Sequence, residues 1–162
     1  MMGTEPAPVH LPFDMLRFAW GLLLLTLAGC GPFPRDIGDT LADIHERGTV
    51  RVGLVAMRSE DEPLARDFLA RLEDATRARV VTDRGPTELQ LARLDQGAID
   101  LVLGDFTSDS PWLPEVAVIE PIVNRPAGDR SLGLSPVAAN GENRWVGLLE
   151  KTVRDMREDA HR

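Results

Sequence analysis

The only cysteine of this 162-residue chain, Cys30, lies directly behind a short apolar run, and its thiol is the most distinctive reactive group in the sequence. The apolar run extends from Phe18 to Ala28, and Gly29 separates it from the cysteine. Its eleven residues are far fewer than the roughly 18 to 20 that a helix needs to cross a hydrocarbon core. A run of this length is typical of the apolar part of a secretory signal peptide.

The tetrapeptide Leu27-Ala28-Gly29-Cys30 resembles the lipobox of bacterial lipoproteins. That resemblance implies that the sulfur of Cys30 receives diacylglycerol, that the chain is then cut before Cys30, and that the new amino group receives a further acyl chain such as palmitate. Two or more acyl chains hold a protein firmly on a bilayer. We therefore expect residues 1–29 to be a lipoprotein signal peptide and residues 30–39 a lipidated tether. The alternative is a buried helix that ends in an inert buried thiol.

Two features near the cleavage site refine this expectation. Met15-Leu16-Arg17 supplies a start and a basic residue at the right distance from the apolar run, so we expect translation to begin at Met15 and not at Met1. Gly31 follows the cysteine, whereas an aspartate there favours retention in the inner membrane of Gram-negative bacteria. We expect the periplasmic face of a membrane, with the outer membrane preferred.

Length and charge limit what the mature chain can be. Removal of residues 1–29 leaves 133 residues, enough for one domain with a sizeable core. It also leaves 17 basic and 24 acidic residues, a net charge of −7. No basic stripe is present to displace counterions from phosphates, which argues against nucleic-acid binding. With Cys30 bound to lipid, no disulfide could stabilise the domain.

Catalytic and metal-binding motifs are missing from the sequence. His10 would leave with the signal peptide, His45 falls in a short amphipathic stretch, and His161 lies in the polar tail. None has an obvious nucleophile to activate. The sequence contains no H-E-x-x-H, Walker loop or C-x-x-C. We expect a protein that is not an enzyme and has no cofactor and no metal.

Hydrophobic periodicity predicts strands that alternate with helices. Alternation with period 2 predicts a strand at 49–55, and helical spacing of apolar residues is clearest at 145–156. Ser59 and Glu62 are spaced as a capping box before a helix that runs to about residue 75. Further helices are expected at 40–46 and after Pro86, and further strands at 80–81, 99–103, 116–119 and 131–134. This order predicts an α/β lobe of three layers, with a mostly parallel sheet of about five strands and helices on both faces.

Several segments in this order resemble bacterial extracellular solute-binding proteins of family 3. Residues 41–53 resemble the opening helix, Gly-Thr turn and first strand of that family, and residues 94–104 resemble its L-x-x-G-x-x-D segment. The match continues through 107–121, and the final helix resembles the one that returns to the first lobe. The resemblance implies a fold like that of a type II periplasmic binding protein.

The chain also departs from the family. Only 18 residues, 122–139, separate Pro121 from the approach to the last helix, so a second lobe cannot fit. We expect residues 40–159 to be the first lobe alone, with its last helix reattached by a loop. In the ligand loop, Asp109 replaces the second threonine and Trp112 stands where the family has an arginine that binds the carboxylate of the ligand. The usual carboxylate recognition is therefore lost.

Open parallel sheets bind ligands beyond the carboxyl ends of their strands. In this chain that rim combines the residues after the first strand with those after the third. We expect Arg58 to pair with an anion, hydroxyl groups to donate hydrogen bonds, and an aromatic ring to stack on the ligand. The candidate ligand-binding residues are Arg58, Ser59, Asp105, Phe106, Thr107, Ser108, Asp109 and Trp112. The alternative is a hydrated loop with one or two aromatic side chains packed beneath it.

Two functions remain open at this stage. The first is a lipid-anchored solute-binding component of an ABC-type transporter, which would bind a small polar solute such as an amino acid. A single lobe covers little more than one side of a solute, so a permease or a second binding chain would supply the other wall. The second function is a lipid-anchored scaffold or interaction protein that keeps the fold without binding a ligand.

Overall fold

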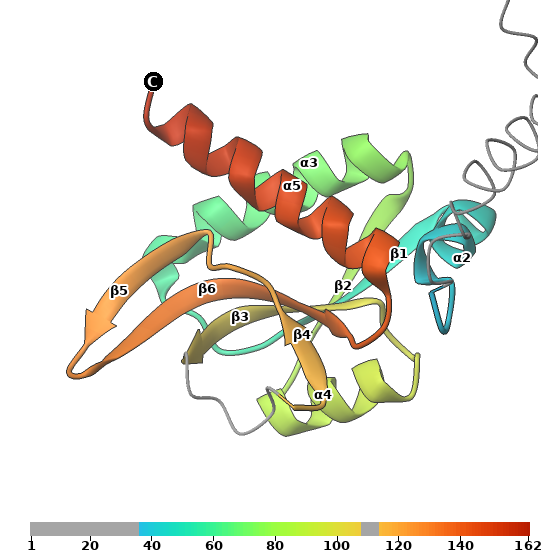
Figure 1. Ribbon diagram of the computed structural model, residues 1–162, viewed down its shortest axis with the longest axis horizontal. Coiled ribbons are helices and arrows are strands. Elements are labelled where there is room, and N and C mark those ends of the chain that lie inside the picture. The colour runs from blue at the N-terminus through green and yellow to red at the C-terminus, as the bar shows by residue number, and fades with distance from the viewer. Residues whose placement is uncertain (1–35, 108–113) are drawn as a thin grey trace, which may run out of the picture. The chain divides into compact units, whose positions relative to one another are not determined.

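A six-stranded sheet with helices on both faces forms the body of the protein (Figure 1). The computed structural model describes residues 36–107 and 114–162, with Ala127 and Arg130 described by their backbone alone. The sequence prediction of a single α/β lobe is confirmed. The elements are α2 (Thr40–Arg47), β1 (Thr49–Leu54), the 3-10 turn η1 (Ser59–Asp61), α3 (Glu62–Thr76), β2 (Arg79–Arg84), α4 (Thr87–Asp95), β3 (Leu101–Thr107), β4 (Val116–Val118), β5 (Val123–Ala127), β6 (Arg130–Ala139) and α5 (Asn143–Ala160).

The sheet is less parallel than the sequence suggests. Its order is β2-β1-β3-β6-β4, and β5 lies beside β4 along the same edge of β6. Strand β1 is parallel to β2 and β3, whereas β6 is antiparallel to β3, β4 and β5. The expected mostly parallel sheet of about five strands is thus corrected to a mixed sheet of six, because the segment 122–139 adds antiparallel strands.

Residues 122–139 form a β-hairpin and not the expected loop. Pro126 indicated irregular structure, but it lies on β5, an edge strand, where a missing N–H is tolerated. Gly128 and Asp129 make the two-residue turn to β6, and Gly128 has a φ of +69°, which glycine adopts at no steric cost. The last helix therefore rejoins the lobe through β6.

The core has one layer on each face of the sheet. Helices α3 and α5 cover one face with Phe68, Leu72, Trp145 and Leu149, all of them fully buried. Helix α4 covers the opposite face, where Leu91 packs in a second cluster of apolar side chains. Figure 1 shows α3 and α5 on one side of the sheet and α4 on the other. Because the helices cover the two faces of the sheet, the ends of the strands remain uncovered by them.

The segment before α2 is bound to the start of α5. The carboxylate of Asp36 accepts a hydrogen bond from the Arg144 backbone N–H at 3.2 Å. The buried carboxylate of Glu142 accepts from the backbone N–H groups of Gly38 and Thr40, the latter at 2.8 Å. Asp36, four residues before the start expected for the lobe, already contacts it.

Candidate functional site

The segment after β1 lies tightly against the end of β3. The Val55 N–H donates to the Leu103 carbonyl at 3.1 Å, and the Asp105 N–H donates to the Ala56 carbonyl at 2.9 Å. A Cβ atom at Gly104 would lie only 2.2 Å from Cγ2 of Val55, so this approach requires glycine. The two predicted halves of the rim are thereby held side by side.

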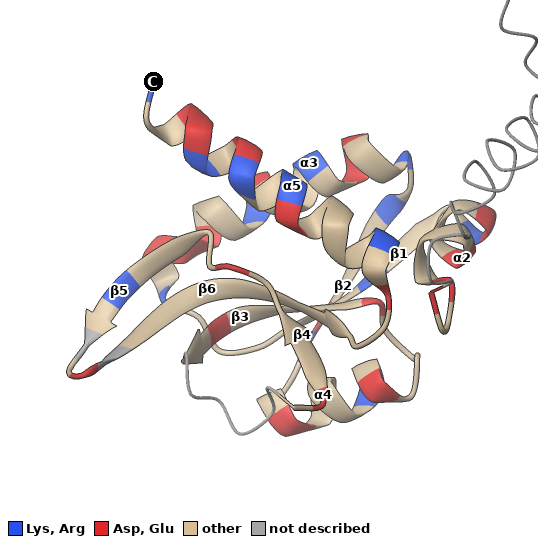
Figure 2. Cartoon of the chain, viewed as in Figure 1, with Lys and Arg blue, Asp and Glu red and all other residues tan. Residues whose placement is uncertain are grey.

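Four candidate residues are brought to this edge of the sheet. Arg58 and Ser59 are exposed on the segment between β1 and α3, while Asp105 and Thr107 are half-buried near the carboxyl end of β3. Ser108, Asp109 and Trp112 lie outside the described residues. Figure 2 shows an acidic position near the end of β3 and a basic position on β5, which lies on the other side of β6.

Phe106 has a different environment from its neighbours in the chain. Its side chain is only 7% exposed and packs on the α4 side of the sheet, in the same cluster as Val102 and Val137. It also contributes, with Asn124, to a small groove of about 230 Å³ beside β5 and β6. The ring thus packs beneath the rim, as in the alternative that we considered for the aromatic residues.

Asp105 has an unsatisfied oxygen. Its Oδ1 atom is buried and has no hydrogen-bond partner within the described part of the chain. Burial raises the pKa of the Asp105 carboxyl, and the negative charge of Asp61 raises it further. The Arg58 backbone and the charges of Arg125 and Arg58 act in the opposite direction. A buried acceptor without a donor is costly in free energy, and a cation that donates a hydrogen bond to this oxygen would remove that cost.

An ion pair that sequence reasoning missed lies beside Asp105. Arg125, on β5, donates from Nη1 to Oδ2 of Asp61 at 2.7 Å and from Nη2 to Oδ1 at 2.5 Å. Asp61 is fully buried, and Oε1 of Glu60 lies 3.5 Å from Nη2 of Arg125. Arg125 was overlooked because its segment was predicted to be a loop. Recognition of Gly128-Asp129 as a hairpin turn would have placed it on a strand paired with β6.

The expected capping box does not form at the start of α3. Ser59 lies in η1, and Asp61 occupies the N-cap position without any side-chain hydrogen bond to the helix. The Asp61 carboxylate turns to Arg125 instead. The side chain of Arg58, expected to meet an anion, lies 3.5 Å from Glu60. The rim is therefore a cluster of mixed charge, with its acidic groups close to β3.

The aspartate of the L-x-x-G-x-x-D segment has a structural role at the opposite end of β3. The buried carboxylate of Asp100 accepts hydrogen bonds from the side chains of Arg47 and Arg51 at 2.6 to 3.2 Å, and from the Arg51 backbone at 2.8 Å. Its own carbonyl accepts from Nε1 of Trp145 at 2.8 Å. Asp100 thus joins α2, β1 and α5 and is far from any solute on the rim.

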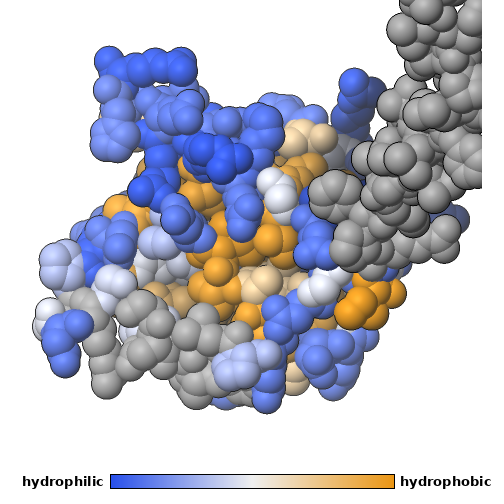
Figure 3. Space-filling view, in the orientation of Figure 1, coloured by the Kyte–Doolittle hydropathy of each residue, from blue (hydrophilic) through white to orange (hydrophobic). Residues whose placement is uncertain are grey.

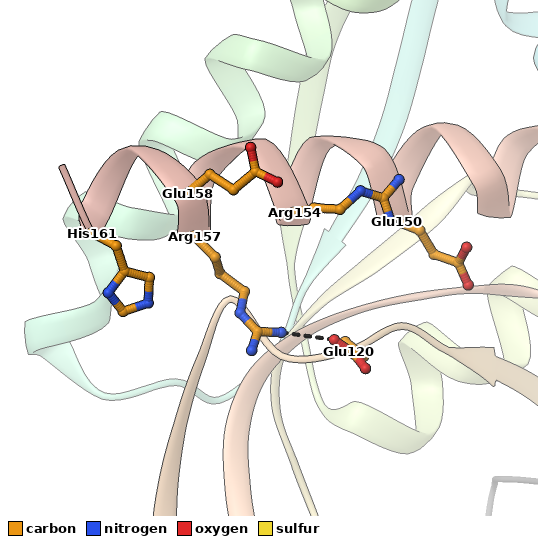
Figure 4. Close-up of a pocket in the computed structure, with 6 residues that line it drawn as sticks. All are labelled: Glu120, Glu150, Arg154, Arg157, Glu158 and His161. Carbon is orange, nitrogen blue, oxygen red and sulfur yellow. Dashed lines mark hydrogen bonds and ion pairs between the residues drawn. The ribbon is translucent and has the colours of Figure 1, made fainter.

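A larger groove of about 410 Å³ lies along the last turns of α5 (Figure 4). Its lining is charged, and Nη1 of Arg157 donates to Oε2 of Glu120 at 2.7 Å. Both side chains are largely exposed, so this pair contributes little. The groove offers no buried or unsatisfied group among the described residues, and we favour the rim as the functional site.

Apolar surface gathers below α5, over β4 and β6 (Figure 3). Ala117 and Val118 of β4 are half-buried, and Val118 packs against the cluster on the α4 side of the sheet. Among the described residues, no group of histidine, cysteine and carboxylate side chains is arranged to hold a metal ion. In the same part of the chain, none of the helices is both long and apolar enough to span a bilayer.

Solved structures of amino-acid-binding proteins share this fold. A point mutant of domain 1 of TmArgBP in its arginine-bound form has a TM-score of 0.63 at 15% identity, covering 73% of this chain and 98% of that one. A substrate-binding protein of an amino-acid ABC transporter from Streptococcus pneumoniae, bound to L-arginine, has a TM-score of 0.63 at 7% identity, covering 75% and 93%. The chain therefore has the fold of one lobe of these proteins.

An ancestral amino-acid-binding protein, described as a precursor of cyclohexadienyl dehydratase, is similar to the same extent. Its TM-score is 0.59 at 12% identity, with 75% of this chain and 94% of that chain covered. No protein-family model matches the sequence. No curated protein matches it either. The similarity is thus one of fold, shared mainly with solute-binding proteins.

Proposed function

We propose that this protein is a lipid-anchored solute-binding lobe that takes a small polar solute, such as an amino acid, on the rim formed by the carboxyl ends of β1 and β3. The observation that carries the proposal is the buried Oδ1 atom of Asp105, which lacks a hydrogen-bond donor within the described residues. An ammonium or guanidinium group of a solute would supply that donor and the matching charge. The proteins of similar fold that bind arginine support this choice of solute.

A partner completes the site in this proposal. Ligand sites commonly bury 70 to 90% of a small molecule, and a single rim covers little more than one side. The β5–β6 hairpin ends in a two-residue turn, so no second lobe is inserted between residues 122 and 139. The permease of an ABC-type transporter or a second binding chain would supply the other wall.

The membrane attachment in this proposal is the lipid on Cys30. The lipobox-like sequence Leu27-Ala28-Gly29-Cys30 supports it, and these residues precede the described part of the chain. With the signal peptide removed, the lobe would begin only six residues after the acylated cysteine, at Asp36. Such a short link would keep the lobe close to the periplasmic face of the membrane.

A lipid-anchored interaction protein without a ligand is the second candidate function. The observation that favours it is the Asp61–Arg125 pair, because the most prominent cation of the rim is already bound within the chain. In that case the rim would stabilise the fold, and partners would bind elsewhere, with the apolar surface over β4 as a candidate contact.

Calorimetric titration separates the two functions. The full chain in detergent is titrated with a panel of L-amino acids, including arginine and lysine. Saturable binding heat in the wild type, with an affinity that Asp105→Asn lowers at least tenfold, would support the solute-binding function. Arg154→Ala, on the exposed side of α5, serves as a control that retains binding. Absence of heat at millimolar concentration of every amino acid would favour the interaction protein.

A further inference from the structure

The guanidinium group of Arg125 is held on the rim with the geometry of a bound ligand. Its two terminal nitrogens donate to the two oxygens of Asp61 in a parallel pair of hydrogen bonds. Oε1 of Glu60 lies 3.5 Å from Nη2. Because a planar guanidinium matches a carboxylate with two parallel bonds, this contact selects the shape of the group as well as its charge.

Arg125 is the side-chain partner of Asp61 within the described part of the chain. Its side chain is fully buried, and it makes no hydrogen bond to the start of α3 even though it occupies the N-cap position. The side-chain hydrogen bonds that the described residues offer to its carboxylate all come from Arg125. Removal of one partner from a buried ion pair is strongly destabilising, so a replacement cation beside Asp61 would restore stability.

Arg125 does not belong to β1 or β3, the two strands whose carboxyl ends form the rim. It lies on β5 opposite Leu132, and Asp105 on β3 lies opposite Leu134, so the two charged residues share one face of the sheet. The buried Oδ1 atom of Asp105 on that face has no partner among the described residues. The hairpin thus carries a cation to the edge of the sheet where a solute would bind.

We propose that this rim is a guanidinium-binding site that the chain fills with its own Arg125. The side chain acts as an internal occupant, and a solute with a guanidinium group binds by displacing it from Asp61. The inference rests on the proposed function, since it describes how the same rim is regulated. The Arg125 side chain is 26% exposed, so its removal opens the place beside Asp61 to solvent.

Chemical rescue of Arg125→Ala tests this inference. The unfolding temperature of the full chain in detergent is measured against methylguanidinium chloride, with methylammonium chloride at the same concentrations as the control salt. We expect a saturable rise of about 3 °C or more with methylguanidinium in the variant, and a smaller rise in the wild type. Methylammonium has the charge without the planar fork and should give at most a third of that rise.

Two further variants locate the effect. Arg157→Ala removes an arginine from an exposed pair with Glu120 and should show no rescue. Asp61→Asn combined with Arg125→Ala should abolish the rescue, because the carboxylate is gone. Arg125→Gln keeps an amide donor for Asp61 and is used if the alanine variant does not fold. The inference is wrong if neither Arg125→Ala nor Arg125→Gln gains stability from methylguanidinium. It is also wrong if neither of these two variants folds at saturating methylguanidinium.

Failure of this inference is distinguishable from failure of the proposed function. Methylguanidinium lacks the amino and carboxylate groups of an amino acid, and it is tested on the variant, whereas the solute titration uses the wild-type chain. Rescue of Arg125→Ala in a chain whose wild type binds no amino acid supports a guanidinium site filled by Arg125, and it contradicts both the displacement of Arg125 by an amino acid and the transport role. Amino-acid binding to the wild type without rescue contradicts the internal occupant alone.

Discussion

Asp61 and Asp105 both lie at the rim, but within the described residues only Asp61 forms an ion pair. Asp61 is fully buried and is neutralised by Arg125, while Asp105 is half-buried with one unsatisfied oxygen. Position along the chain singled out Asp105, because it follows closely on the strand expected at 99–103, which the structure extends to Thr107. It did not single out Asp61, because the helix start was expected to be capped by Ser59 and Glu62, and the partner of Asp61 lies 64 residues away.

The pKa of Asp105 leads to a prediction about pH. Burial raises this pKa, so the folded state favours the neutral acid more than the unfolded chain does. The resulting cost is absent below the ordinary pKa of about 4 and grows as the pH rises through the higher folded value. We expect Asp105→Asn to stabilise the lobe by up to about 1 kcal/mol at pH 7 and to give no gain below about pH 4. Urea unfolding at a series of pH values measures this; an equal gain at every pH would contradict it.

A second prediction concerns Asp100, where a substitution should destabilise the lobe. Its buried carboxylate is bound by Arg47 and Arg51, and removal of one side of such a pair leaves uncompensated charge. We expect Asp100→Ala to lower the free energy of unfolding by about 3 kcal/mol. Solute binding by any molecule that remains folded should be unchanged, because Asp100 lies at the other end of β3. Weakened binding in folded protein would place Asp100 in the site.

At the scale of elements, local patterns predicted most of the lobe. Period-2 alternation located β1, and apolar residues at helical spacing located α3 and α5. A strand at 131–134, within β6, was expected, but the β5–β6 hairpin was missed because Pro126, Pro136 and the two glycines in 122–139 resemble a loop. The physical reason is that proline is tolerated on an edge strand and that Gly133 is required by packing, neither of which is visible in a local pattern.

Two glycines of the lobe should respond in opposite ways to alanine. A Cβ at Gly133 would lie 2.5 Å from Pro121 Cβ and 2.7 Å from the Val123 carbonyl, so Gly133→Ala should destabilise by about 1 to 3 kcal/mol. Gly147, exposed on α5, has open space around such a Cβ, and Gly147→Ala should stabilise by about 0.5 to 1 kcal/mol. Thermal unfolding of both variants measures the difference, and a destabilised Gly147→Ala would contradict the open surface of α5.

At the scale of the whole molecule, the chain combines an expected lipid anchor with a single described lobe. We predict that Cys30→Ser abolishes incorporation of labelled palmitate and releases the protein from the membrane fraction, because the thiol is the only one in the chain. Metabolic labelling and fractionation measure both effects. Labelling that persists in the serine variant would contradict acylation at this position.

The fold class and the place of the rim followed from the sequence, since the order of strands and helices determines where the carboxyl ends of β1 and β3 meet. The charges on the rim did not follow, because Arg125 reaches it through an antiparallel strand whose pairing depends on distant residues. The environment of Phe106 also differs from the expected ligand contact. Alternation along β3 places its ring on the α4 face, away from Asp105.

The most direct test of a solute site on this rim is a titration followed through the backbone amide signals in an ¹H–¹⁵N NMR spectrum. We predict that L-arginine added to the wild-type chain shifts the amides of residues 56–61 and 104–107 saturably, with smaller changes elsewhere. Absence of shifts at millimolar arginine and lysine, or shifts confined to the groove between Glu120 and Arg157, would contradict a solute site at the carboxyl ends of β1 and β3.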